Sequence, residues 1–135
     1  MEQQSGAKEF RPGLRFSVMD GCIVVATILS LYFTRHLEWY VGFIIYFTVG
    51  HFFLFCNVFR ISRIPELIWS GIFLAATIGT IIFSIPGWPL TIAISLVTTI
   101  ILIAREVKKP SYHGIMWRRF NPNLHDWWEK EVLKD

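Results

Sequence analysis

The residue best suited to chemistry inside a membrane is a histidine in the middle of a long apolar segment. His51 follows Gly50 in the run GHFFLFCN. Ionisable side chains are costly in hydrocarbon and often mark function there. A neutral imidazole can ligate a haem or a chlorophyll- or bacteriochlorophyll-type pigment, or bond a quinone carbonyl, and Gly50 would leave a flat slot for such a ring. The alternatives are proton or ion handling, or a structural bond to a hydroxyl such as that of Thr77 or Ser95.

Three other polar residues stand where apolar segments begin or end: Asp20, Asn57 and Arg60. We expect Asp20 to pair with Arg60 or Arg63, or to accept a hydrogen bond from Asn57, near the inner membrane surface. Such positions are tolerable because headgroups and water are close. The predicted role is structural, with part of an ion path as the alternative.

No pattern of residues predicts a metal site or a catalytic centre. The possible ligands are Asp20, Cys22, His51, Cys56 and Asn57. Asp20 and Cys22 are two residues apart and His51 and Cys56 are five apart, so neither pair shares a helix face. The sequence contains no G-x-S-x-G, no HExxH and no glycine loop for phosphate. The two cysteines form no CxxC. We therefore predict no catalytic residues, no metal and no enzymatic activity.

Composition places the chain in the membrane class. Its 135 residues are 53% hydrophobic and 17% charged, whereas soluble domains carry about a quarter charged residues. The mean hydropathy is +0.47. The net charge of +3 does not indicate nucleic-acid binding, because the basic residues flank apolar segments as juxtamembrane charges do. We predict an all-α integral membrane protein.

Four apolar segments predict a bundle of four transmembrane helices. A span needs about 20 apolar residues, and the fourth segment is the shortest. The first segment could instead be a signal peptide, but no A-x-A-like cleavage site follows it. The expected organisation is a polar arm at 1–15, a transmembrane domain at 16–104 with helices at about 16–34, 39–59, 65–85 and 89–104, and a basic, aromatic tail at 105–135.

The basic residues predict the orientation. Three lie in the arm, two in the connection at 60–64 and seven after Ala104, whereas Arg35 alone lies in another connection. Positive charges favour the cytoplasmic side, so twelve of thirteen fall on one side if both termini are cytoplasmic. The expected location is a bacterial inner membrane or an equivalent energy-transducing membrane.

Small residues recur at four-residue spacing and predict close helix packing. We expect these faces to pack against one another within the bundle. The alternative is that the face of Gly71, Ala75 and Gly79 docks on another chain. The predicted packing residues are Ala26, Ser30, Gly71, Ala75, Gly79 and Ser95.

The tail mixes aromatic and basic residues, as segments at a membrane interface do. After Pro110 come Trp117, Arg118 and Arg119, and a short amphipathic helix with Trp127 and Trp128 is predicted over 124–133. This helix should lie on the membrane surface or on a partner protein.

The pattern as a whole favours a non-catalytic accessory subunit of a larger membrane complex, with the lipid bilayer and other membrane subunits as partners. One alternative is a small oligomeric channel or transporter, with His51 and the hydroxyls of the fourth segment along its path. Another is an electron-transfer or photosynthetic subunit that binds its cofactor at His51. The sequence leaves the oligomeric state open.

Overall fold

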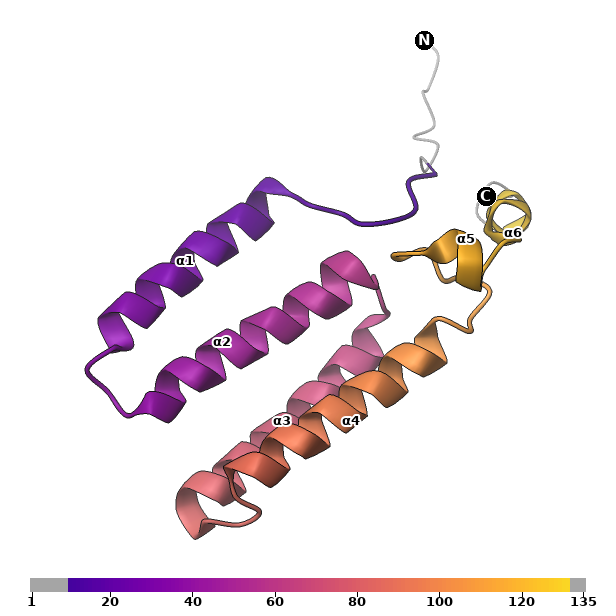
Figure 1. Ribbon diagram of the computed structural model, residues 1–135. Helices are drawn as coiled ribbons and strands as arrows, with labels where there is room; N and C mark the ends of the chain where they lie inside the picture. Colours follow the sequence, from indigo (N-terminus) through magenta and orange to yellow (C-terminus); the bar gives the residue numbers. More distant parts are fainter. Residues whose placement is uncertain (1–9, 132–135) are drawn as a thin grey trace.

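A computed structural model describes residues 10–131, and all regular secondary structure in that part of the chain is helical. The all-α prediction is therefore confirmed there. The first nine residues of the arm and the predicted helix end at 132–133 lie outside the described residues. The elements, shown in Figure 1, are α1 (Val18–Thr34), α2 (Trp39–Phe53), the π-helix η1 (Leu54–Val58), α3 (Arg63–Phe83), α4 (Trp88–Glu106), α5 (Trp117–Phe120) and α6 (Leu124–Glu131).

Three of these helical segments are long and apolar enough to cross a membrane: α2 with η1, α3 and α4. Helix α4 has 19 residues and is longer than the sequence suggested. The apolar helix α1 has 17 residues, or about 26 Å at helical rise, and is slightly shorter than the other three. It runs antiparallel to α2 (Figure 1).

A capping box formed by Ser17 and Asp20 marks the start of helix α1. The backbone N–H of Ser17 donates to Asp20 Oδ2 at 2.6 Å, and the N–H of Asp20 donates to Ser17 Oγ at 3.4 Å. Two unpaired N–H groups at the helix start are satisfied in this way. Asp20 is thus a helix-capping residue.

Helices α3 and α4 form a closely packed hairpin. The hydroxyls of Thr80 and Thr91 lie 2.7 Å apart, and the indole N–H of Trp69 donates to the Ser95 carbonyl at 3.2 Å. Every third or fourth residue of each helix is buried along this contact, and small side chains on α4 make room for large ones on α3. The buried positions are Trp69, Phe73, Thr77 and Thr80 on α3 and Thr91, Ser95 and Thr99 on α4.

Helix α2 joins this hairpin through aromatic rings. The Phe47 ring lies 5.2 Å from the Phe73 ring, centroid to centroid. Phe55, Trp69, Phe73 and Leu102 form the buried apolar core. The core therefore lies between α2 with η1, α3 and α4, while α1 contributes no buried residue.

The end of α2 widens into the π-helix and then turns sharply. The N–H of Phe59 donates to the Leu54 carbonyl, five residues back, and Arg60 adopts a left-handed backbone with φ +48°. The carbonyls of Asn57 and Val58, which a continuing helix would have used, are then left for other segments. Such open carbonyls at a helix end need partners from elsewhere.

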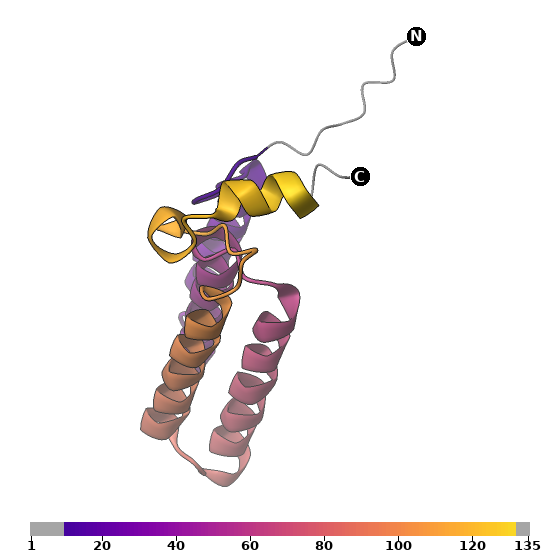
Figure 2. The ribbon, with the colours of Figure 1, turned by 90° about the vertical axis from the view of Figure 1, so that its right-hand side faces the viewer.

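The arm and the tail supply these partners. Arg15 N–H donates to the Asn57 carbonyl at 3.2 Å, and Ile115 N–H donates to the Val58 carbonyl at 2.8 Å. Gly13 N–H also donates to the His113 carbonyl at 2.7 Å. Arm, connection and tail therefore form one layer across the end of the helices, and Figure 2 shows α6 lying across that end. We call this layer, residues 10–16, 57–62 and 107–131, the cap.

Candidate functional site

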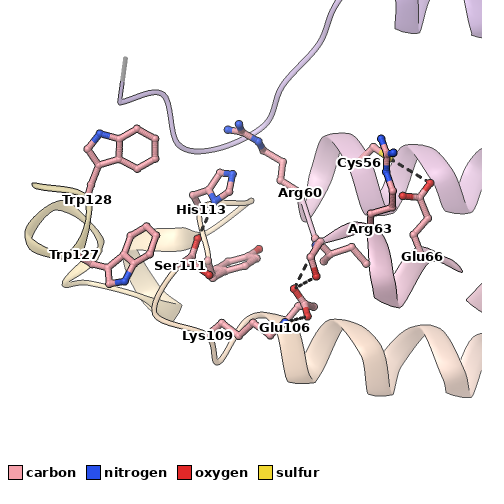
Figure 3. A pocket seen from close by; sticks show the side chains of 13 residues that line it. Cys56, Arg60, Arg63, Glu66, Glu106, Lys109, Ser111, His113, Trp127 and Trp128 are labelled. Atoms are coloured by element: carbon pink, nitrogen blue, oxygen red, sulfur yellow. Dashed lines mark hydrogen bonds and ion pairs between the residues drawn. The ribbon is translucent and has the colours of Figure 1, made fainter. Parts of the chain in front are cut away.

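A cavity of about 530 Å³ lies between the cap and the ends of α3 and α4. Most of the residues that line it have polar or charged side chains (Figure 3). We call it the polar cavity. Its lining residues are Cys56, Arg60, Ile61, Ser62, Arg63, Glu66, Glu106, Lys109, Ser111, Tyr112, His113, Trp127 and Trp128.

One carboxylate of the polar cavity, that of Glu106, has several partners. Glu106 is buried, and its Oε2 accepts from the N–H and the hydroxyl of Ser62 at 3.4 and 3.2 Å. Its other oxygen forms an ion pair with Lys109. Truncating one member of such a buried set leaves an uncompensated charge. Glu106 thus ties the end of α4 to the start of α3 and to the tail.

Cys56 and His113 both line the polar cavity. The Cys56 thiol donates to the Glu66 carboxylate at 3.7 Å, and His113 Nδ1 lies 2.8 Å from the Ser111 carbonyl. The cysteine and the histidine therefore each have a different partner. Within residues 10–131 no three His, Cys, Asp or Glu side chains are arranged to hold a metal ion.

Tyr112 and Gly114 fit the tail closely against the η1–α3 connection. The buried Tyr112 hydroxyl donates to the Ile115 carbonyl at 2.9 Å. Burial raises the pKa of this phenol to about 12. A Cβ on Gly114 would overlap the carbonyl oxygen of Phe59 and approach the Tyr112 hydroxyl. The tail can reach the connection this closely only because residue 114 has no side chain.

A second cavity of about 470 Å³ lies beneath the arm. We call it the arm cavity. Its charged groups are Arg11, Arg15 and Arg60, with His113 beside them, and no carboxylate among residues 10–131 lines it. Arg60 Nη1 donates to the carbonyls of Arg11 and Gly13 at 2.6 and 3.4 Å. Burial, with repulsion from Arg15, lowers the pKa of the Arg60 guanidinium from its ordinary value.

Arg60 therefore does not form the ion pair with Asp20 that was one expectation from the sequence. Its guanidinium turns to the arm's carbonyls, because the left-handed backbone at Arg60 directs the chain across the cap. Asn57, another expected partner of Asp20, lines the same pocket as Asp20. Asn57 is buried at this point.

His51 is buried within an aromatic cluster. Its Nδ1 lies 2.9 Å from the Phe47 carbonyl, and since a carbonyl only accepts, Nδ1 carries the proton of the neutral ring. The ring stacks on Trp69 with centroids 4.3 Å apart and planes 14° apart. Trp69 thus covers one face of the imidazole, while no atom lies within 4 Å of where a Cβ on Gly50 would be. His51 lines none of the cavities described here. Visible absorbance of the purified protein would test the cofactor hypothesis directly.

Neither of the two expected hydroxyl partners bonds to His51. Ser95 Oγ donates to the Thr91 carbonyl of its own helix at 2.8 Å. The Thr77 hydroxyl is buried and has no hydrogen-bond partner among the described residues. The histidine is therefore held by its own helix and by Trp69.

The predicted packing residues divide into two groups. Ser95 is fully buried against α3, and Gly79 approaches the Ile85 carbonyl closely in the α3–α4 hairpin. The other four, Ala26, Ser30, Gly71 and Ala75, are exposed. At Gly71 no atom lies within 4 Å of where a Cβ would be. Packing within the chain thus accounts for Gly79 and Ser95 only.

The aromatic residues of the tail pack partly on the arm. Phe10 makes edge contacts with the rings of Trp117 and Trp128, at 5.9 and 5.5 Å between centroids. Trp127 lines the polar cavity. Arg118 and Arg119 are exposed. The helices of the tail therefore lie partly against the arm of the same chain.

Sequence reasoning missed the residues that build the cap, above all Glu106, Tyr112, His113 and Gly114. One signal was present: Glu106 is a lone carboxylate among basic residues at the end of an apolar segment. The three consecutive residues 112–114 gave no signal, because their partners are backbone atoms, which residue types do not identify.

Comparisons with known proteins found no matching family model, no matching curated protein and no matching solved structure. The class of protein therefore follows from the fold and the candidate site alone. Over the described residues this is an all-helical chain with three helices suited to a membrane and a hydrogen-bonded polar cap at one end.

Proposed function

We propose that the chain spans the bilayer four times, with the arm and the tail on the cytoplasmic face. The observation that supports this count is the hydrogen bond from Gly13 in the arm to His113 in the tail. An odd number of spans would put these segments on opposite faces. Helix α1 would then be the first span, and its modest length is within what a bilayer accommodates by local thinning.

The distribution of charge supports the cytoplasmic placement of the cap. The basic residues of the described chain gather at this end, and Arg35 alone lies in the α1–α2 connection. The α3–α4 connection has no charged residue. Short loops rich in Lys and Arg remain on the cytoplasmic side.

Within that topology, we propose a non-catalytic subunit of a larger membrane complex. Helix α1 buries no residue, and α3 leaves Gly71 and Ala75 open while its other face is packed. Small residues let a neighbouring helix approach closely, which is a main source of association in lipid. The uncovered face of α3 therefore suits a helix of another subunit.

The hydroxyls of α4 favour this role over that of a channel. Thr91, Ser95 and Thr99 are buried against α3. Ser95 and Thr99 donate to carbonyls of their own helix at 2.8 Å. The Thr91 hydroxyl bonds across the hairpin to that of Thr80, and these three residues line none of the cavities described above.

Gentle solubilisation followed by native mass measurement tests the proposal. We expect the chain to leave the membrane in an assembly with other membrane proteins. Gly71→Leu should release it from that assembly, because the added side chain separates the helices. Ala93→Leu, which places the same side chain at an exposed position of α4, should not. A stable particle that contains a single copy of this chain alone would contradict the proposal.

A further inference from the structure

Two cavities of the chain meet at the side chains of Cys56 and Glu66. Both residues line the polar cavity, and both also line a third cavity, of about 350 Å³, beside α1 and α2. We call it the α1–α2 cavity. The Cys56 thiol donates to the Glu66 carboxylate at 3.7 Å, and a thiol is a weak donor. The two cavities therefore adjoin at a pair of side chains that a weak bond holds together.

The α1–α2 cavity extends from this junction along apolar side chains, away from the cap. Its apolar residues are Ile23 on α1 and Val49, Phe52 and Phe53 on α2. Along the helix axis, Val49 is about 10 Å from Cys56 at helical rise. Ile23 is exposed, and α1 buries no residue, so an apolar chain in the surrounding lipid can enter from this side. A polar cavity that adjoins an apolar one fits a molecule with a polar head and an apolar chain.

The charges at the junction indicate which polar head fits. Arg63 lies one helical turn before Glu66 at the start of α3 and also lines the polar cavity. Figure 3 shows Cys56, Arg63 and Glu66 close together, at the end of the polar cavity away from Trp128. Asp20 brings a second carboxylate to the α1–α2 cavity.

Two carboxylates at one junction repel a head that carries negative charge alone, and such repulsion gives specificity. A head that carries both a phosphate and a primary ammonium complements the pair of Arg63 and Glu66. The guanidinium forms charge-assisted hydrogen bonds to phosphate oxygens. The ammonium, with its three N–H donors, bonds to a carboxylate.

We propose that the two cavities together bind a phospholipid whose headgroup carries a primary ammonium, as that of phosphatidylethanolamine does. The ammonium donates to Glu66, the phosphate accepts from Arg63, and an acyl chain lies in the α1–α2 cavity. This inference rests on the placement of α1, α2 and α3 in the bilayer that is proposed above, and it does not depend on the partner subunit. Side-specific labelling of cysteines tests that placement separately.

The first test compares headgroups. The full chain in detergent is titrated with phosphatidylethanolamine, phosphatidylcholine or phosphatidylglycerol of the same acyl chains, and native mass spectrometry gives each dissociation constant. Phosphatidylethanolamine should bind most tightly, because the choline head has no N–H donor and the glycerol head has no positive charge. Glu66→Gln should weaken phosphatidylethanolamine about tenfold or more without weakening the other two lipids. Glu131→Gln, at an exposed position of α6 outside all three cavities, should bind as the unaltered chain does.

Two further pairs of variants test the phosphate and the acyl chain. Arg63→Gln should weaken all three lipids, since each contains the phosphate, whereas Arg119→Gln should not. Ile23→Trp fills the α1–α2 cavity and should weaken phosphatidylethanolamine, whereas Ile28→Trp makes the same replacement at an exposed position of α1 and should not. Arg119 and Ile28 line none of the three cavities. Glycerophosphoethanolamine, the head without acyl chains, should bind at least about tenfold more weakly than the lipid, because buried CH₂ groups add affinity.

Equal affinity for the three lipids, or tighter binding of phosphatidylcholine or phosphatidylglycerol, would overturn the proposal. Equal losses in the two members of any pair of variants would overturn the assigned site. Binding of glycerophosphoethanolamine as tight as that of the lipid would overturn the role of the α1–α2 cavity. Any of these results together with the labelling pattern of four spans would be a failure of this inference alone.

Discussion

Replacing Gly114 with alanine tests how the tail is held on the helices. A Cβ at this position would overlap the Phe59 carbonyl oxygen, and that atom belongs to backbone, which cannot rotate away. The tail must then move off the η1–α3 connection. Two hydrogen bonds beside residue 114 depend on its position, from Gly13 to the His113 carbonyl at 2.7 Å and from Ile115 to the Val58 carbonyl at 2.8 Å.

Each of these bonds contributes about 0.5–1.5 kcal/mol to docking. Loss of both therefore costs about 1–3 kcal/mol, or roughly 5- to 150-fold in the ratio of docked to undocked tail. Amide hydrogen exchange at Gly13 and Ile115, measured in detergent or nanodiscs, reports that ratio, because an amide exchanges when its bond opens. We expect faster exchange at both amides by this factor.

Gly71→Ala is the matched control, because a Cβ there meets no atom within 4 Å. It should leave the exchange at Gly13 and Ile115 unchanged. Unaltered protection of both amides in Gly114→Ala would refute the close contact between tail and connection.

Two further predictions concern the α3–α4 hairpin and the pH dependence of the cap. Thr80→Val and Thr91→Val should each destabilise the hairpin in a reversible unfolding assay. A double-mutant cycle should give a coupling energy of about 0.6 kcal/mol, with about 1.7 kcal/mol as the upper end. Additive effects of the two substitutions would contradict the bond between the two hydroxyls. Because the pKa of Tyr112 is about 12 in the fold and 10.0 ordinarily, the undocked tail loses this proton first, so docking should weaken as pH rises from about 10 to 12. The protection factor of the Ile115 amide, which compares its exchange rate with that of a free amide at the same pH, should fall over this range. In Tyr112→Phe it should stay constant, and a fall in that variant would assign the effect to another group.

The apolar helices were predictable, whereas the cap was not. Helix positions follow from the length of apolar segments and from local signals such as Pro65 near the start of α3. The Ser17-x-x-Asp20 spacing is itself a capping signal, yet Asp20 was interpreted through possible partners on other helices. The bonds between Asp20 and the nearby Ser17 thus make Asp20 a capping residue, whereas we had expected its partners on distant segments.

The contacts of the cap join backbone groups about 40 to 100 residues apart in the sequence, as between Gly13 and His113. Every residue except proline has the same N–H and C=O, so residue types do not show which groups pair. The same reasoning applies to the small-residue faces, since spacing predicts a face suited to packing but not its partner. Ser95 packs within the chain, and Gly71 remains uncovered.

The most direct test of the topology is side-specific labelling of single cysteines with a reagent that cannot cross membranes. In sealed vesicles of known orientation, and with Cys22 and Cys56 replaced by alanine, cysteines are introduced one at a time at Leu14, His36, Ile85 and Arg119, all exposed. The four-span account predicts that positions 14 and 119 react from the cytoplasmic side, and positions 36 and 85 from the opposite side. Reaction of position 14 from the same side as position 85 would contradict it.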